Sequence, residues 1–200
     1  MTYIMAKPLK PKVALTVANL QQFTISSNFQ LIYSYFKVHP LNTDFMTVAS
    51  KIALIDSTNS THLALYQNVF SISDIADIIV DLAINYNLDT LIQNGDTQAI
   101  EKIAQACKLK GINLFSFATK YCCYHNICVY RKDDYSIYDS VFATYLPYYA
   151  SVSTYKIETC RANMDYKSYN KLIENILNTH KINIPDRRRL FDNFIWKTYK

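Results

Sequence analysis

Apolar residues recur at intervals of three and four along most of this chain, and that spacing constrains its fold more than any other feature. In the segment 44–56, for example, Phe45, Val48, Ala49 and Ile52 would share one side of a helix. Helices of this kind bury one apolar stripe against each other and leave the opposite side to solvent. We therefore predict an all-α fold with, at most, a minor β element.

Polar residues that cap helices place several helix starts. Ser73-Asp74 precedes an apolar stripe that begins at Ile75, and Asp96 follows the turn at Asn94-Gly95. Such side chains accept hydrogen bonds from the free N–H groups of a first helical turn. We expect a helix after Ser73-Asp74, a short segment at 62–69, and further helices near 13–22, 26–36, 44–56, 97–109, 166–179 and 187–198. The stretches 126–137 and 151–159 are less regular, and Ile127 and Val152 lie in short runs that could be extended.

Composition identifies a globular chain without a membrane span. Half of the 200 residues are hydrophobic, with 17 Tyr and 10 Phe, which suits a single domain over 1–200. There is no apolar run of about 18 residues, and the N-terminus lacks the pattern of a signal peptide. Five cysteines, an odd number, favour reduced thiols. We expect a cytoplasmic protein.

Positive charge is concentrated in the second half of the chain. Residues 107–200 carry a net charge of +7, whereas residues 37–106 carry −5, and the whole chain carries +5. A basic region of this kind suits a polyanionic ligand, although charge runs are also common on solvated faces.

The stretch from Gly111 to Leu146 contains the residues with the clearest chemical potential. Gly111 is one of only two glycines, which indicates a backbone bend that other residues would resist. Ser116 is expected to cap a helix that carries Lys120 in its first turn, and Asp139 is expected to cap the next helix. A lysine and an aspartate at two successive helix starts are therefore predicted to meet in one cleft.

The chain resembles bacterial proteins with an 8-oxoguanine DNA glycosylase (OGG) fold, in the helix-hairpin-helix glycosylase superfamily. The resemblance is carried by Ser116-Phe-Ala-Thr-Lys120-Tyr121, His125 and Ile137-Tyr-Asp139-Ser140, with weaker similarity at Lys51-Ile-Ala-Leu-Ile, Ser60-Thr61, Asn94-Gly95-Asp96 and Phe191–Lys197. It implies a helical domain whose hairpin and catalytic stretch span about 97–146. Glycosylases with lyase activity use a lysine after the hairpin and an aspartate before the following helix. Lys120 and Asp139 match that pair in type, order and separation.

The resemblance implies a DNA glycosylase, with or without AP-lyase activity, that removes a damaged or modified base such as 8-oxoguanine. Asp139 would stabilise positive charge on the sugar, and Lys120 would attack C1′ and form a Schiff base. Burial and the positive end of its helix would lower the pKa of Lys120. Four aromatic residues could hold the extruded base or take its place in the duplex: Phe115, Phe117, Tyr121 and Tyr138.

DNA is the expected partner. In the superfamily the hairpin turn is Gly-hydrophobic-Gly, and here it is Gly111-Ile112-Asn113, with Lys120 seven residues further on. Asn tolerates the left-handed conformation that the second glycine would adopt. Phosphate contacts are expected from the residues around the turn and the cleft, which are Lys108, Lys110, Gly111, Asn113, Arg131 and Lys132.

Simpler interpretations exist for each of these features. Lys120 and Asp139 could form a plain salt bridge. The cysteines at 122, 123 and 128 are expected to pack in the core, because they lack a second pair that would complete a zinc site, and no cofactor or metal is expected. Arg187-Arg188-Arg189 is read as the polar start of the last helix, which Trp196 would anchor to the core. The alternative function is a non-catalytic protein on the same fold, either nucleic-acid-binding or an interaction protein in phage defence.

Overall fold

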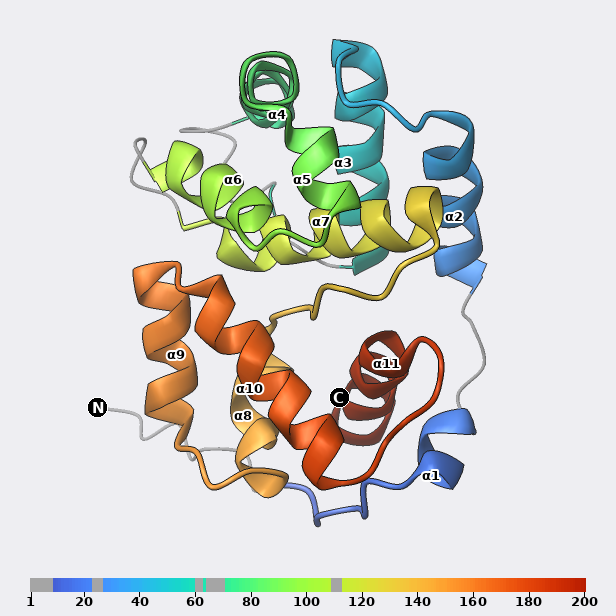
Figure 1. Cartoon of the computed structure of the whole chain (residues 1–200), viewed down its shortest axis with the longest axis vertical. Helices are drawn as coiled ribbons and strands as arrows, with labels where there is room; N and C mark the ends of the chain where they lie inside the picture. Colours follow the sequence, from blue (N-terminus) through green and yellow to red (C-terminus); the bar gives the residue numbers. More distant parts are fainter. Residues whose placement is uncertain (1–8, 23–26, 60–62, 64–70, 109–112) are drawn as a thin grey trace, which may run out of the picture.

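The fold is helical in every part of the chain that the structure describes. The computed structural model describes residues 9–22, 27–59, 63, 71–108 and 113–200, and these ranges contain no strand. The all-α prediction is confirmed (Figure 1). The elements are α1 (Val17–Gln21), α2 (Ser27–Val38), α3 (Phe45–Asn59), α4 (Ile72–Tyr86), α5 (Leu88–Gln93), α6 (Gln98–Lys108), α7 (Phe115–Tyr130), α8 (Ser140–Tyr145), the 3₁₀ turn η2 (Leu146–Tyr148), α9 (Thr154–Asn163), α10 (Tyr166–Thr179) and α11 (Arg187–Tyr199).

The helices form two halves that one extended segment connects. Helices α2 to α7 make up one half, α1 and α8 to α11 make up the other, and residues 131–139 run between them (Figure 1). The N-terminal segment belongs to the second half, because the backbone N–H of Val13 donates to the hydroxyl of Tyr199 at 3.0 Å. Buried apolar residues from both halves form one continuous cluster.

Helix α7 lies at the centre of the first half and is buried nearly all round. Thirteen of its 16 residues are buried, so it shows no solvent-facing stripe. It continues through the predicted extended stretch 126–137 as far as Tyr130, and Arg131 ends it with a φ of 58°. The extended prediction is therefore wrong for 126–130. It is also wrong for most of 151–159, because Ser153 caps helix α9 there.

Several predicted caps are confirmed and two are corrected. Asp139 caps α8, with its Oδ1 accepting from the N–H of Phe142 at 2.8 Å, and Asp96 accepts from Gln98 at the start of α6. Helix α4, however, is capped by Ser71 in a reciprocal capping box with Asp74, and not by Ser73.

Ser116 does not cap α7. The helix begins one residue earlier, at Phe115, whose N–H donates to the side chain of Asn113 at 3.0 Å. Lys120 consequently lies in the second turn, so the positive end of the helix has less influence on it than predicted. The predicted residues Gly111 and Ile112 lie outside the described residues, as does the segment 62–69 except for the buried Leu63.

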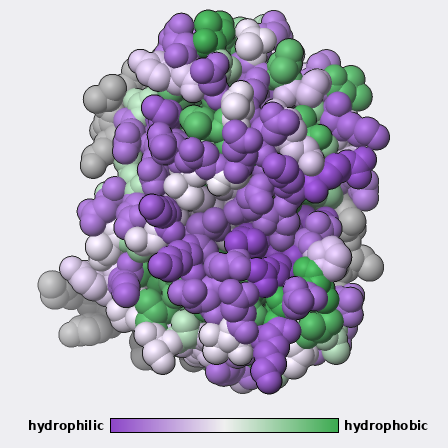
Figure 2. All heavy atoms as spheres, in the orientation of Figure 1, coloured by the Kyte–Doolittle hydropathy of each residue, from purple (hydrophilic) through white to green (hydrophobic). Residues whose placement is uncertain are grey.

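The surface is predominantly hydrophilic on the face shown in Figure 2, where hydrophobic side chains form small separate groups. None of the helices in the described ranges is both long enough and apolar enough to cross a membrane.

Candidate active site

A cavity of about 220 Å³ lies where the two halves meet, and both predicted catalytic residues line it. Helices α2, α3 and α7 form one side, and α11 with the end of the connecting segment forms the other. The lining residues are Phe29, Ile32, Thr58, Lys120, Cys123, Tyr124, Ile137, Asp139, Arg189, Asp192, Asn193, Trp196 and Lys197. The prediction that Lys120 and Asp139 face one cleft is confirmed.

Lys120 is a buried amine held at the edge of the cavity. Its side chain is only 6% exposed, and its Nζ donates to the hydroxyl of Ser116 at 3.3 Å. Ser116 in turn donates to the carbonyl oxygen of Tyr138 at 2.9 Å, which fixes the hydroxyl one helical turn before the lysine. Burial lowers the pKa of Lys120, while Asp139 and Asp192 oppose that shift. The unprotonated, nucleophilic form is therefore more accessible than in a free lysine.

Asp139 is held by donors on both carboxylate oxygens. Oδ1 accepts from the backbone N–H of Phe142, and Oδ2 accepts from the indole N–H of Trp196. Both donors fix the orientation of the carboxylate toward the cavity. No ion pair within 4.0 Å joins Lys120 to Asp139, although both residues are fully described. The plain salt bridge is thus not formed.

A second carboxyl group, Asp192, reaches the same cavity from α11. Burial and the negative charge of Asp139 raise the pKa of Asp192 to about 8, against the opposing effect of Lys120. Its Oδ1 is shielded from solvent and has no hydrogen-bond partner in the described structure. The two aspartates therefore differ in their surroundings, because Asp139 has donors on both oxygens, whereas Asp192 has none on Oδ1 and its raised pKa favours the protonated form.

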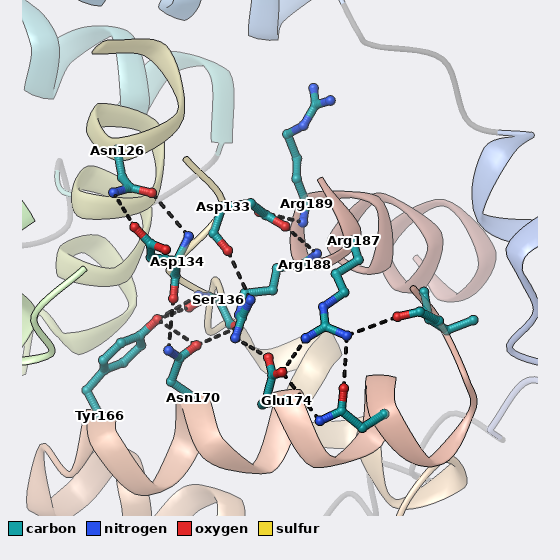
Figure 3. Close-up of polar contacts among 12 residues, drawn as sticks. Asn126, Asp133, Asp134, Ser136, Tyr166, Asn170, Glu174, Arg187, Arg188 and Arg189 are labelled. Carbon is teal, nitrogen blue, oxygen red and sulfur yellow. Dashed lines mark hydrogen bonds and ion pairs between the residues drawn. The ribbon is translucent and has the colours of Figure 1, made fainter. Parts of the chain in front are cut away.

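The connecting segment that carries Asp139 is attached to both halves of the protein (Figure 3). Asn126 of α7 donates to the carboxylate of Asp134 at 3.1 Å and accepts from the N–H of Asp134 at 3.2 Å. From α10, Asn170 donates to the carbonyl of Asp134 at 2.9 Å, and Tyr166 accepts from the N–H of Ser136. These bonds leave little freedom for the segment that orients Asp139.

The three arginines at the start of α11 belong to an ion-pair network (Figure 3). Arg187 and Arg188 both donate to the carboxylate of Glu174 in α10. Asp133 accepts from the backbone N–H of Arg188 at 2.8 Å and of Arg189 at 3.3 Å, so it caps α11 from the connecting segment. The prediction that these arginines begin the last helix is confirmed.

The predicted base-binding aromatics are wrong, because all four residues belong to the core. Phe115, Phe117, Tyr121 and Tyr138 are at most 3% exposed, and none of them lines the cavity. The aromatic rings that do line it are those of Phe29, Tyr124 and Trp196. Trp196 is only partly buried and points at Asp139, so its role differs from the predicted core anchor.

Asp192 and Trp196 are the site residues that the sequence reasoning missed. They lie one helical turn apart in α11 and thus on one side of that helix. The sequence indicated Asp192 only through its position between Phe191 and Phe194, where an acidic residue interrupts an apolar helical stripe.

Only part of the predicted DNA-contacting set can be placed. Lys110, Gly111 and the side chain of Lys108 lie outside the described residues. The amide of Asn113 is engaged with Phe115 and with the carbonyl of Arg161, so it serves the fold. Arg131 and Lys132 are exposed, with Arg131 over the ring of Tyr33 and Lys132 donating to the carbonyl of Gln93.

The Cys/His segment of α7 packs in the core, as predicted for the cysteines. Cys122, Cys123 and Cys128 are at most 2% exposed, and burial raises the pKa of each thiol. His125 is fully buried, and burial lowers its pKa. Among the described residues, no group of His, Cys, Asp or Glu has the arrangement of a metal site.

Comparison with known proteins assigns the chain to a family. Residues 13–133 match the family HI_0787_N, described as an N-terminal domain. The chain belongs to the HI_0787_N family. The HI_0787_N match includes Lys120 and ends within the connecting segment, before Asp139 and Asp192.

A curated relative comes from Haemophilus influenzae. This "uncharacterized protein" is 25% identical over 144 residues, which cover 72% of the chain. The chain matches 64% of the length of that relative. No solved structure matches this HI_0787_N member.

Proposed function

We propose that this protein is a DNA glycosylase with AP-lyase activity that removes a damaged or modified base. The observation that carries the proposal is the convergence of Lys120 and Asp139 on one cavity, with the lysine almost fully buried and its pKa lowered. The resemblance at 116–140 to glycosylases of the helix-hairpin-helix superfamily suggested the same two residues independently of the geometry.

The two residues suit the two chemical needs of base removal. Breaking the bond between base and sugar leaves positive charge on the sugar, and a fixed carboxylate close by stabilises that charge. Asp139 is such a carboxylate, since the Phe142 N–H and the Trp196 indole hold both of its oxygens. The unprotonated amine of Lys120 can then form a bond to C1′, and the resulting Schiff base permits strand cleavage by β-elimination.

The size and lining of the cavity suit a single extruded base. Its volume of about 220 Å³ is below the roughly 300–1,000 Å³ usual for pockets that hold drug-sized ligands. Phe29, Tyr124 and Trp196 provide ring faces and edges against which a base can pack. Arg189, which also pairs with Asp186 at 2.8 Å, and Lys197 place basic side chains at the same cavity, where they can contact the phosphates on either side of the nucleotide.

Borohydride trapping provides the decisive test. Wild-type protein is incubated with duplexes that each carry one modified base, among them 8-oxoguanine, or an abasic site, and the Schiff base is reduced to a stable adduct. Lys120→Gln should abolish the adduct while DNA binding remains, and Asp139→Asn should slow base release by about 10²-fold or more. Asn retains the ability to cap α8, so the variant should stay folded.

Two matched substitutions away from the cavity control for the loss of charge. Lys102→Gln changes a lysine of α6 that lies over the ring of Tyr86, and Asp81→Asn changes an exposed aspartate of α4. Both should behave as wild type. Adducts that persist in Lys120→Gln, or base release that is unchanged in Asp139→Asn, would contradict the proposed site.

Salt dependence tests whether DNA is the partner. Each phosphate contact should weaken binding by roughly 0.9 log units per log unit of salt. Strong, salt-dependent binding without any base release or trapping would favour a non-catalytic DNA-binding protein instead.

A further inference from the structure

We propose that Asp192 is a second catalytic residue, a general acid that protonates the departing base and recovers its proton from Lys120. This inference rests on the proposed glycosylase function. It assigns a role to a carboxyl group that has none in the mechanism proposed for Lys120 and Asp139. The observations behind it are the position of Asp192 in the cavity wall and the absence of any partner for its Oδ1 in the described structure.

The position of Asp192 is set by α11. Trp196, one turn further along that helix, donates to Asp139, so the same side of α11 that fixes one carboxylate presents the other. Lys120 of α7 interacts electrostatically with both aspartates. A substrate in the cavity would therefore contact an amine and two different carboxyl groups.

The two carboxyl groups differ in the hydrogen bonds that they accept. Asp139 accepts two hydrogen bonds from fixed donors, whereas Oδ1 of Asp192 accepts none from the described residues. Burial and the nearby Asp139 raise the pKa of Asp192 to about 8. Two carboxyl groups at one site with different environments are the usual arrangement for separating the acid from the anion in hydrolytic and lyase chemistry.

The charged groups around Asp192 come from three parts of the molecule. Lys120 faces it from α7, Asp139 from the connecting segment, and Arg189 and Lys197 from α11 itself. Lys200 adds a positive charge, and Asp56 of α3 adds a weaker negative charge, and both act on Lys120. The surrounding charges are thus mixed in sign, and burial remains the first cause that keeps Asp192 protonated.

The proposed step balances in atoms and charge. The bond between C1′ and the base nitrogen breaks, and its electron pair moves to the base. Asp192 donates its proton to the base, which leaves as a neutral molecule, while Asp139 stabilises the charge on the sugar. The lone pair of Lys120 Nζ forms the new bond to C1′, and the ammonium group that results returns one proton to the Asp192 carboxylate. The acid is therefore restored before the Schiff base forms.

The test compares base release with capture of a site that has already lost its base. Asp192→Asn preserves the size and neutrality of the protonated side chain and cannot transfer a proton. It should slow single-turnover base release by about 10²-fold or more, measured on the duplex of the trapping panel that wild type processes fastest. Borohydride trapping on a preformed abasic duplex should stay within about threefold of wild type, because no base remains to be protonated.

The pH profile gives a second readout that a purely structural role would not produce. Wild-type base release should decline above a pH of about 8 as Asp192 loses its proton, and Asp192→Asn should lack this decline. Circular dichroism and thermal melting check that the variant is folded, and Asp81→Asn serves as the matched exposed control.

The outcomes distinguish failure of the Asp192 assignment from failure of the proposed glycosylase function. Base release by Asp192→Asn at the wild-type rate would overturn the assignment of Asp192, as would an equal loss of base release and abasic-site trapping. Wild-type protein that traps on abasic DNA but releases no base would also overturn it. Wild-type protein that neither releases a base nor traps would overturn the proposed glycosylase function itself.

Discussion

Replacing Asp133 should show how the segment that carries Asp139 is held against α11. Asp133 accepts from the N–H groups of Arg188 and Arg189 at the start of α11, where the local N-cap residue, Asp186, makes no capping bond through its side chain. Asparagine has one acceptor oxygen and can keep the shorter of these bonds, from Arg188, whereas alanine can keep neither, and neither variant is charged. Asp133→Asn should therefore be more stable than Asp133→Ala by about 1–2 kcal/mol, the usual contribution of a helix cap.

The charge of Asp133 has the opposite effect on stability. Burial raises its pKa from 3.8 to about 6, despite the hydrogen bonds and the attraction of Arg188. The folded state thus holds the proton more tightly than the unfolded state, and the stability linked to that proton is present below about pH 4 and lost as pH rises through about 6. A shift of about two pKa units corresponds to about 3 kcal/mol at pH 7, which is the upper limit of the gain expected for Asp133→Asn.

Thermal unfolding of the three proteins at pH 4 and pH 7 measures both effects. For a chain of this size, the asparagine variant should melt about 2–8 °C above the alanine variant at either pH. It should also melt above wild type at pH 7, with the difference shrinking toward pH 4. Equal melting of the two variants would exclude capping by Asp133. An asparagine variant that is less stable than wild type at pH 7 would show that the hydrogen bonds to the carboxylate and the attraction of Arg188 outweigh the cost of burial.

Three further substitutions test other parts of the structure. Gly95→Ala should lower the free energy of unfolding by about 2–4 kcal/mol in urea denaturation, because Gly95 has a φ of 68° and an added Cβ would lie 2.8 Å from Asp134; wild-type stability would contradict this. Trp196→Phe keeps an aromatic ring but removes the donor to Asp139, so single-turnover base release should slow about tenfold, while the circular dichroism spectrum stays the same. An unchanged rate would show that the indole does not position the carboxylate. Burial lowers the pKa of Lys51 to about 8, whereas the unfolded chain keeps this proton up to about pH 10.5, so the stability of the wild type should rise with pH between these values. Thermal melts of Lys51→Met should lack this rise in stability. A rise of the same size in the variant would assign it to other groups.

Local features of the sequence predicted most of the helices and two residues of the site, Lys120 and Asp139. Asp139 and Asp96 cap the helices assigned to them, and the helix predicted at 166–179 has those bounds in the structure. Caps and apolar periodicity involve residues within a few positions of one another, so they can be read without knowing the fold. Lys120 and Asp139 line one cavity and are also close in the sequence, because only the rest of helix α7 and the connecting segment separate them.

Only the tertiary structure decided what surrounds that pair. The indole that holds Asp139 comes from Trp196, 57 positions along the chain, and Asp192 reaches the cavity from the same helix. Tyr138 and Tyr121, by contrast, turn into the core, where Tyr138 binds Glu158 and Tyr121 binds Asn42. The sequence alone does not show whether an aromatic or acidic residue lies in the core, on the surface or in a site. The site roles of Trp196 and Asp192 depend on which side of α11 faces the cavity, and packing between the two halves of the molecule fixes that side.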